Sequence, residues 1–584
     1  MLLFKPPAKV IFSLLFILYS NFSLADNLQA ESIRIQQQQK QLENVLSKTQ
    51  DIYLSQVDSK QEIFQLGQHE TPCFAIQQFN LVGEKADQFS FLLNKIIKKS
   101  QFKSGMCLGT QSIQYLQTLA QNIVIDEGLV TTQLYIAPQD LTTGTLRFSI
   151  EPGYIGKLKF NQNGAQLNTL GQYATFPVNR QKILILSELE QGLENLRRLS
   201  GVEATIRIEP ATDMLGESNV IVERYQPKSW FLTLGVNDAG SKTTGKYQGN
   251  ISLQFNNLLG INDLVYVGYN QDLGHHKVSY VDRFGKKTDS GTQGYSLHYS
   301  VPFGYWLWSI NHSYHTYNEA TEGYYVNYDY SGKTYNTNMN LNRLIFRHKQ
   351  HKTTLGMKLW RLRMYKYIDD AEIEVQRRQM GGWEANLAHH MQLGRAIINA
   401  NVSYKRGTGI FNSQPAPEEF NDEHDAIPGT SRMKIINATL DIAIPFQLFK
   451  QPFSLDSSLA LQWNKTPLIP QDKLSIGGRY TVRGFDGGRS LSGEKGWYWQ
   501  NNVNWHYLDH HRIYFGVDVG RVSGRSTQGL PEQKLVGAVI GVTGHFLLFN
   551  GQLQYQFSLA KPCDKPTDFR TAATTYGLNL SYRY

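Results

Sequence analysis

From Trp230 to Tyr584 the sequence consists of short segments in which apolar and polar residues alternate, with turn residues between them. In Leu553–Leu559, for example, leucine, tyrosine and phenylalanine alternate with two glutamines and a serine. Successive side chains of a strand point to opposite faces, so such a segment has one apolar and one polar face. A barrel in a membrane needs this arrangement, because its outside contacts lipid and its lumen contacts water. The pattern therefore predicts a mainly β protein with a transmembrane barrel.

The number and spacing of the segments predict an antiparallel barrel of about 16 strands. The clearest segments are Trp230–Val236, Asn250–Phe255, Leu264–Tyr269, Tyr295–Val301, Trp306–Tyr314, Thr354–Leu362, Ala396–Tyr404, Ile435–Ile444, Leu455–Trp463, Trp497–Trp505, Ile513–Val519, Leu535–Val542, Leu553–Ser558 and Tyr576–Tyr584. Short links such as Asp509–His511 alternate with long ones such as Asn412–Thr430. Short turns at one end and long loops at the other are typical of outer-membrane barrels, whereas a soluble β-sandwich is the less favoured alternative.

The first 25 residues have the features of a secretory signal peptide. Lys5 and Lys9 precede the apolar core Val10–Tyr19, and Ser23-Leu24-Ala25 is a small-x-small cleavage site. The apolar run is too short to span a bilayer core of about 30 Å, so a membrane anchor is disfavoured. Residues 26–50 are rich in glutamine and predict a helix without a strong apolar face, which suits solvent or a watery cavity. A polar linker, residues 51–72, follows.

Three cysteines remain after the signal peptide: Cys73, Cys107 and Cys563. Disulfides form in the oxidising compartments that exported proteins reach. Cys73 and Cys107 lie in one small segment, so we predict a bridge between them, while Cys563 is distant and is expected to be unpaired. The alternative is that all three thiols are reduced and buried.

Two units with the order β-α-α-β-β are predicted between the linker and the barrel, in residues 73–152 and 153–226. The predicted elements of the first unit are a strand Phe74–Val82, helices Phe89–Lys99 and Thr110–Ile125, and strands Val130–Ala137 and Thr145–Glu151. The second unit repeats this order with Ile155–Phe160, a weakly patterned first helix, Leu186–Leu199, Val202–Glu209 and Ser218–Arg224.

Several short motifs occur in a characteristic order along the chain. They are Gly128-x-Val130-Thr131-Thr132, Pro138-Gln139-Asp140-Leu141, Glu188-Leu189-Glu190-Gln191-Gly192-Leu193, Asn237-Asp238-x-Gly240, Asn257-Leu258-Leu259-Gly260-x-Asn262-Asp263, Val482-Arg483-Gly484-Phe485 and Phe515-x-x-Asp518-x-Gly520. In these motifs the chain resembles the outer-membrane transporters of two-partner secretion (TpsB type), within the superfamily that joins POTRA domains to a barrel. The resemblance is greatest to the transporters of contact-dependent inhibition toxins and of haemolysins.

The resemblance implies a division of the chain into a signal peptide (1–25), a plug helix (26–50), a linker (51–72), POTRA 1 (73–152), POTRA 2 (153–226) and the barrel (227–584). It also implies that the loop carrying Val482-Arg483-Gly484-Phe485 folds back into the lumen. A charge inside a barrel needs a partner, and Asp518 faces inward by alternation. We therefore expect Arg483 to pair with Asp518, Gly484 to allow the turn, and Val482 and Phe485 to complete the tip. The alternative is an exposed loop with a solvated Arg483.

By this resemblance the protein is expected to be an outer-membrane pore. It would export a large exoprotein partner with an N-terminal secretion domain, such as a toxin, haemolysin or adhesin, from the periplasm to the cell surface. An edge strand along Val130–Ala137 or Val202–Glu209 would bind the unfolded partner by β-addition. Besides the exoprotein, outer-membrane lipid is the expected partner, and the chain is expected to be a monomer.

No cofactor, metal, nucleotide or nucleic acid is expected. Gly240–Lys246 resembles a P-loop but lacks its Ser or Thr and its following helix. The net charge is +9, yet the chain contains no dense run of Lys and Arg, which argues against nucleic-acid binding. An insertase that assembles other barrels is the main alternative function. A barrel enzyme would need a nucleophile, base and acid that we find no pattern for, and a passive porin would not need the two α/β units.

Overall fold

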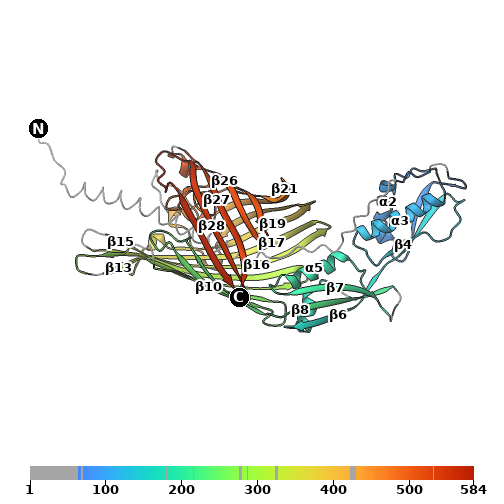
Figure 1. Cartoon of the computed structure of the whole chain (residues 1–584), viewed down its shortest axis with the longest axis horizontal. Coiled ribbons are helices and arrows are strands. Elements are labelled where there is room, and N and C mark those ends of the chain that lie inside the picture. The colour runs from blue at the N-terminus through green and yellow to red at the C-terminus, as the bar shows by residue number, and fades with distance from the viewer. Residues whose placement is uncertain are drawn as a thin grey trace.

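The computed structural model describes residues 64–584, except 68–69, 179, 213, 215, 275–278, 286, 323–325, 421–428 and 531. The predicted signal peptide and plug helix lie outside the described residues. The described chain forms two small α/β units at one end and a large β-barrel at the other, arranged along the long axis of the molecule (Figure 1). No helix among the described residues is both long and apolar enough to cross a membrane.

The first α/β unit packs two helices against a three-stranded sheet. Its elements are β1 (Phe74–Ile76), β2 (Gln78–Gly83), η1 (Ala86–Phe89), α2 (Phe91–Ser100), β3 (Met106–Leu108), α3 (Thr110–Asp126), β4 (Gln133–Tyr135) and β5 (Thr145–Glu151). The sheet order is β2-β5-β4, and β1 and β3 form a separate antiparallel pair. Alternate residues of β5, namely Leu146, Phe148 and Ile150, are buried in a core that the helices complete.

Two predicted strands of this unit differ from the observed ones. The segment Phe74–Val82 is interrupted at Gln77, whose backbone N–H donates to Gly144 instead of continuing one ladder. The segment Val130–Ala137 contains only the three residues of β4. Its first part forms a turn, because Thr132 N–H donates to Leu129 and the Gln121 side chain donates to the Thr132 carbonyl.

The second α/β unit has the predicted element order. Its elements are β6 (Tyr154–Gly164), α4 (Thr169–Thr175), α5 (Leu186–Arg197), β7 (Glu203–Pro210) and β8 (Glu217–Gln226). The sheet order is β6-β8-β7, with β6 parallel and β7 antiparallel to β8. The weakly patterned first helix is the short α4, which Asn168 begins by accepting a hydrogen bond from Gly171 N–H at 2.8 Å.

Sixteen long antiparallel strands in the described chain close into a barrel. They are β9 (Trp230–Asn237), β10 (Gln248–Asn256), β11 (Leu264–Asp272), β14 (Gly291–Phe303), β15 (Trp306–Thr321), β16 (Tyr328–His348), β17 (His351–Ile368), β19 (Arg378–Leu393), β20 (Ala396–Thr408), β21 (Lys434–Leu448), β22 (Gln451–Asn464), β25 (Lys495–Leu508), β26 (His511–Ser523), β27 (Lys534–Leu548), β28 (Gly551–Asp564) and β29 (Thr575–Arg583). β29 pairs with β9 and completes the circle. In β28 the aromatic Phe557 is exposed on the outside, whereas Gln554 and Gln556 line the lumen, as alternation predicts.

Two barrel strands, β16 and β19, are absent from the segments picked out by alternation. β16 has 21 residues, and its ladder with β15 runs from the Trp306–Arg343 pair to the Thr321–Tyr328 pair. The aromatic pairs Tyr314–Tyr335 and Tyr317–Tyr330 lie across this ladder, with ring centroids 4.9 and 6.3 Å apart. Cross-strand aromatic pairs stabilise a ladder even where the surrounding residues are polar.

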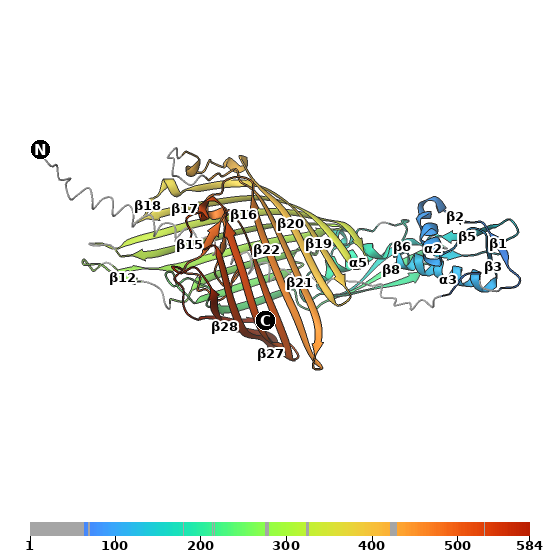
Figure 2. The same ribbon diagram turned by 90° about the horizontal axis from the view of Figure 1, so that it is seen from above.

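The two ends of the barrel differ, as Figure 2 shows. On the side of the α/β units the strands are joined by tight turns, such as the two residues between β27 and β28. On the other side the links are long, and the longest described one (465–494) joins β22 to β25. This loop contains the short hairpin β23 (Leu474–Ile476) and β24 (Leu491–Gly493). Its middle part faces β9–β11 and β28–β29 across a lumen cavity of about 730 Å³.

Candidate functional site

Arg483, in the long loop between β22 and β25, makes three hydrogen bonds to Asp518 of β26. Arg483 Nε donates to Oδ2 at 2.6 Å, Nη2 donates to Oδ1 at 2.6 Å, and the backbone N–H donates to Oδ2 at 3.0 Å. The Asp518 side chain is fully buried and that of Arg483 is 15% exposed. A two-pronged guanidinium–carboxylate contact is both strong and directional. The structure thus brings together the two charged residues of the sequence motifs.

The residues next to Arg483 pack the tip of the loop against the barrel wall. Val482 and Phe485 are buried in an apolar cluster, and the Phe485 ring meets Phe569 edge-on at 5.7 Å. The other buried members of the cluster are Ile476, Leu491, Val522 and Leu535. Gly484 has φ +105°, and a Cβ there would lie 2.5 Å from the Lys561 carbonyl oxygen. Only glycine therefore fits this position of the turn.

Glycines in the wall strands leave the space that the tip occupies. A Cβ on Gly516 of β26 would lie 2.7 Å from Arg483 Nη2, and a Cβ on Gly520 would lie 2.7 Å from Val482 Cγ2. A Cβ on Gly537 of β27 would overlap the Arg483 carbonyl oxygen. Gly520 belongs to a motif found in the sequence, but its steric role, and those of Gly516 and Gly537, follow only from the position of the loop.

A second pair of contacts, not foreseen from the sequence, attaches the same loop to the closing strands. Arg479 forms an ion pair with Asp238, which follows β9. Asp238 Oδ1 also accepts the backbone N–H of Leu578 in β29 at 2.7 Å. The loop is therefore fastened where the first and last strands of the barrel meet. Asp238 lies in the Asn237-Asp238-x-Gly240 motif. This motif was the sequence feature that could have indicated a functional role for Asp238.

Asp486 ties the loop to the β9–β10 link. Lys242 Nζ lies 2.7 Å from Asp486 Oδ2, and Thr571 and Gly488 also donate to this carboxylate. Burial opposes ionisation of Asp486, but the hydrogen bonds from Lys242 and Gly488 outweigh it and hold its pKa below the ordinary value. The carboxylate is therefore charged near neutral pH, and the ion pair with Lys242 persists.

Helix α5 of the second α/β unit docks on the turn between β16 and β17. Arg347 Nε lies 3.1 Å from Glu190 Oε2 and Arg347 Nη2 lies 2.9 Å from Glu194 Oε1, with all three side chains at most 6% exposed. Lys352 Nζ adds a contact of 3.3 Å to Glu194. Glu190 lies within the Glu188–Leu193 motif and Glu194 directly follows it, so the charged residues of this segment join the unit to the barrel.

The turn between β10 and β11 is the second docking point of this unit. Asn257 Nδ2 donates to the Gln166 carbonyl at 2.9 Å, and Asn262 Nδ2 donates to the Asn195 carbonyl at 2.6 Å. Arg198 donates to the Asn262 carbonyl at 2.8 Å. Burial lowers the pKa of Arg198 to about 10, which still leaves it charged at neutral pH. The Asn257–Asp263 motif is thus a turn shaped for the second unit.

Glu188 of α5 lies near the turn between β14 and β15. Burial raises its pKa above that of an ordinary glutamate, although a hydrogen bond from Tyr305 and the charge of Lys182 act in the opposite direction. The junction therefore contains the carboxylate of Glu188, whose burial disfavours its ionised form.

In the first α/β unit, Cys73 and Cys107 are joined by a disulfide, with Cα atoms 5.3 Å apart. Cys73 directly precedes β1 and Cys107 lies in β3, which pairs with β1. Cys563 is free and exposed. Among the described residues, no group of three or more His, Cys, Asp and Glu side chains is arranged to hold a metal ion.

β4 and β7, which contain most of the predicted partner-binding segments, each lie at an edge of their three-stranded sheet. An edge strand has unpaired backbone groups on one side and can accept a further strand. β7 has eight residues and β4 only three, so β7 has the longer edge for such an addition.

Comparison with known proteins covers nearly the whole described chain. The family described as haemolysin secretion/activation protein ShlB/FhaC/HecB matches residues 216–544, a POTRA domain of ShlB type matches 74–153, and a further POTRA domain matches 154–210. Outer membrane transporter CdiB-2 of Burkholderia pseudomallei is 30% identical over 534 residues, which cover 88% of this chain and 87% of the relative. Hemolysin transporter protein ShlB of Serratia marcescens is 23% identical, covering 71% of each chain. The solved structure of CdiB from Acinetobacter baumannii has a TM-score of 0.80 at 27% identity, covering 96% of this chain and 99% of that one.

Proposed function

The chain belongs to the haemolysin secretion/activation family ShlB/FhaC/HecB, and from this membership we propose how it handles its partner. It is an outer-membrane transporter of two-partner secretion, which exports an exoprotein through the barrel to the cell surface. Its two POTRA domains lie on the periplasmic side. We propose that the partner is a single large toxin, haemolysin or adhesin with an N-terminal secretion domain, that the transporter acts as a monomer in outer-membrane lipid, and that it has no enzymatic activity.

The division of labour along the chain is part of this proposal. The signal peptide (1–25) directs export, the helix 26–50 plugs the resting lumen, and residues 51–72 link it to POTRA 1 (73–152) and POTRA 2 (153–226). The edge of β7 binds the unfolded partner through backbone hydrogen bonds, which place few demands on its sequence. The barrel (227–584) conducts it outward. Folding of the emerged partner prevents its return.

The Arg483–Asp518 contact is the observation that carries this mechanism. It places a loop with buried charges across part of the lumen, where each charge is stable only while the other is present. A passive pore gains nothing from such a costly arrangement, whereas a transporter needs a lumen that is narrow at rest and rearranges during passage. The loop is therefore the element that we expect to move.

Deletion of the gene tests the function. One very large polypeptide should disappear from the cell surface and the culture supernatant, and it should return when the wild-type gene is restored. Mass spectrometry of surface and supernatant proteins before and after deletion identifies that polypeptide. Loss of many outer-membrane barrel proteins instead would favour the insertase alternative, and an unchanged surface would contradict the proposed function.

A further inference from the structure

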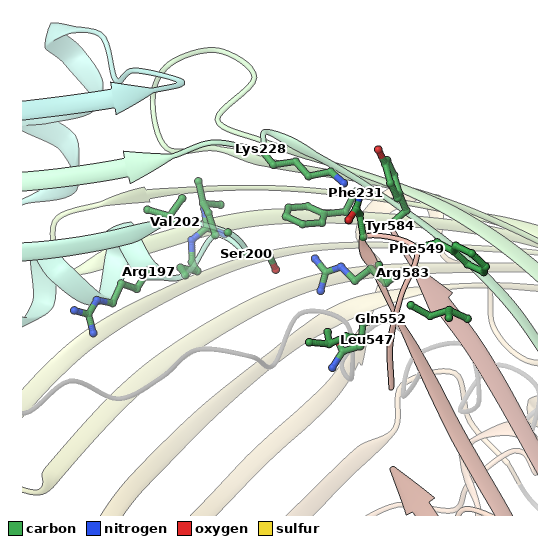
Figure 3. Close-up of a pocket in the computed structure, with 16 residues that line it drawn as sticks. Arg197, Ser200, Val202, Lys228, Phe231, Leu547, Phe549, Gln552, Arg583 and Tyr584 are labelled. Carbon is green, nitrogen blue, oxygen red and sulfur yellow. The ribbon is translucent and has the colours of Figure 1, made fainter. Parts of the chain in front are cut away.

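A second cavity lies outside the loop site, between POTRA 2 and the periplasmic mouth of the barrel (Figure 3). Its volume is about 830 Å³. One wall is the segment Arg197–Val202, between α5 and β7, and the other is formed by the start of β9, the turn between β27 and β28, and the C-terminal residues. None of the family motifs found in the sequence lies in this cavity.

Two cations face the cavity without a carboxylate partner. Neither Lys228 nor Arg583 forms a salt bridge in the part of the chain that the structure describes. Lys228 Nζ lies 3.7 Å from the centre of the Tyr584 ring, and the Arg583 guanidinium lies 4.4 Å from the centre of the Phe231 ring. Burial and the nearby Arg583 charge lower the pKa of Lys228.

The remaining arginines of the cavity wall are engaged elsewhere. Arg197 points away from the cavity in Figure 3 and donates to the Ala204 carbonyl. Arg198 donates to Ser300 and Asn262. Arg583, by contrast, points across the cavity toward Ser200 in Figure 3. Arg583 also donates to Gln254 Oε1 at 3.3 Å, and among these cations Lys228 and Arg583 are the two whose charged ends face the cavity.

The rim of the cavity is apolar. Leu547 is 84% exposed and Phe549 is 82% exposed, at the turn between β27 and β28. A ligand that carries both negative charge and apolar groups would match the cations and the rim of this cavity.

The cavity lies between the lumen and the edge strand of POTRA 2. Arg583 lines both this cavity and the lumen cavity. Val202, on the opposite wall, is followed directly by the edge strand β7. A chain lying along β7 would pass this cavity before it reached the lumen.

We propose that this cavity is the inlet through which an extended, unfolded segment of the exported polypeptide passes from POTRA 2 into the barrel. Lys228 and Arg583 bind acidic side chains of the segment, and Leu547 and Phe549 contact its apolar ones. The inference rests on the proposed export function. It assigns the side of the barrel mouth at which the polypeptide enters.

Site-specific photocrosslinking in living cells tests the inlet. A photoreactive phenylalanine derivative replaces Phe549, or Phe449 as the matched control. Phe449 occupies the equivalent position of the β21–β22 turn, with φ 50° against 48° for Phe549, and is 89% exposed. Position 549 should crosslink to the polypeptide whose surface display depends on the transporter, and position 449 should not.

Charge reversal provides the second measurement. Lys228→Glu, alone and with Arg583→Glu, should lower the export rate about tenfold at equal amounts of folded barrel, because like charges would then repel acidic segments. Lys450→Glu, in the control turn, should leave export unchanged. Heat-dependent migration in gels reports whether each barrel is folded.

The results of these experiments distinguish failure of the inlet proposal from failure of the export function. If no polypeptide depends on the transporter, the export function is wrong. If export proceeds but position 549 captures nothing, captures only a phospholipid, or captures no more polypeptide than position 449, the inlet is wrong and the function stands. Normal export by the folded Lys228→Glu barrel would also overturn the role of the charges.

Discussion

At the scale of single residues, the Asp518 carboxylate is the centre of the loop attachment. Both of its oxygens accept from the Arg483 guanidinium, and one of them also accepts from the Arg483 backbone. The carboxylate is fully buried, so it has no water to replace a lost donor. The contact therefore depends on the identity of both side chains, and also on the backbone position that Gly484 allows.

Arg483→Ala should abolish or strongly reduce export while leaving a folded barrel. Removing one member of a buried pair typically costs about 3–5 kcal/mol, because the other charge is stranded. The exchange Arg483→Asp with Asp518→Arg should restore only part of the activity, since it leaves the backbone N–H of residue 483 without its carboxylate. Partner protein in the supernatant is the readout. Arg489→Ala, an exposed arginine of the same loop, is the control. If the Arg483→Ala variant exports its partner at the wild-type level, the Arg483–Asp518 contact is not required for export.

Glu188 makes the POTRA 2 junction sensitive to pH. Its pKa is raised in the folded state, so folding favours the protonated form, and stability falls as pH rises through the unfolded and then the folded pKa. Glu188→Gln cannot ionise and can still accept from Tyr305. Its Tm should exceed that of the wild type at pH 8 and equal it at pH 4. Equal Tm values at both pH values would show that burial of Glu188 does not affect stability.

At the scale of elements, turns and helices that look unrelated in sequence are paired across the junction. Helix α5 carries the glutamates, the end of β16 carries Arg347, and the β10–β11 turn carries the asparagines. Each contact joins a polar group of POTRA 2 to a tight turn of the barrel, so the orientation of POTRA 2 is set by directional bonds.

Arg347→Ala should loosen α5 from the barrel. It leaves Glu190 and Glu194 buried without their main partner, a change expected to cost about 3–5 kcal/mol. Faster hydrogen exchange in Leu186–Arg197 is the expected observation. Lys349→Ala, which removes only an exposed pair with Asp126, should change exchange little. Identical exchange in both variants would contradict the assigned role of Arg347.

The disulfide acts on the first POTRA domain alone. It links residues 34 positions apart and should stabilise that domain by about 3–4 kcal/mol in the chain-entropy account. The double change Cys73→Ser with Cys107→Ser should therefore make POTRA 1 more sensitive to protease, while Cys563→Ser should not. Peptide mapping without reductant should recover the bridged peptides. Two free thiols in protein purified from the envelope would contradict the pairing.

At the scale of the whole molecule, the lumen is partly filled by the loop, and its periplasmic mouth is flanked by POTRA 2. The barrel seam is short, with five residue pairs between β9 and β29, and Arg479 fastens the loop beside it. The loop is thus fastened to the seam, and movement of the loop is expected to affect the seam.

Residues 28–48 should occupy the resting lumen and leave it during transport. This polar segment is about 30 Å long as a helix, enough to span the barrel, and is followed by a long linker. A variant lacking these residues should show larger and steadier openings in single-channel recordings. Deletion of an equal length of the linker is the control, and unchanged conductance in the plug variant would refute the proposed plug.

The alternation of apolar and polar residues by itself determined the barrel, because membrane and water select the two faces of every strand. The local periodicities likewise determined the helices of POTRA 1 and the second helix of POTRA 2, and the paired motifs led to Arg483 and Asp518. The strands β16 and β19 show the limit of this signal, because they were not among the clearest alternating segments and are defined only by their pairing with β15, β17 and β20. The Arg479–Asp238 attachment, the docking of α5 and the cavity at Lys228 were decided only by tertiary structure. Each joins residues whose proximity depends on how the barrel closes and where the loop returns, which local sequence does not encode.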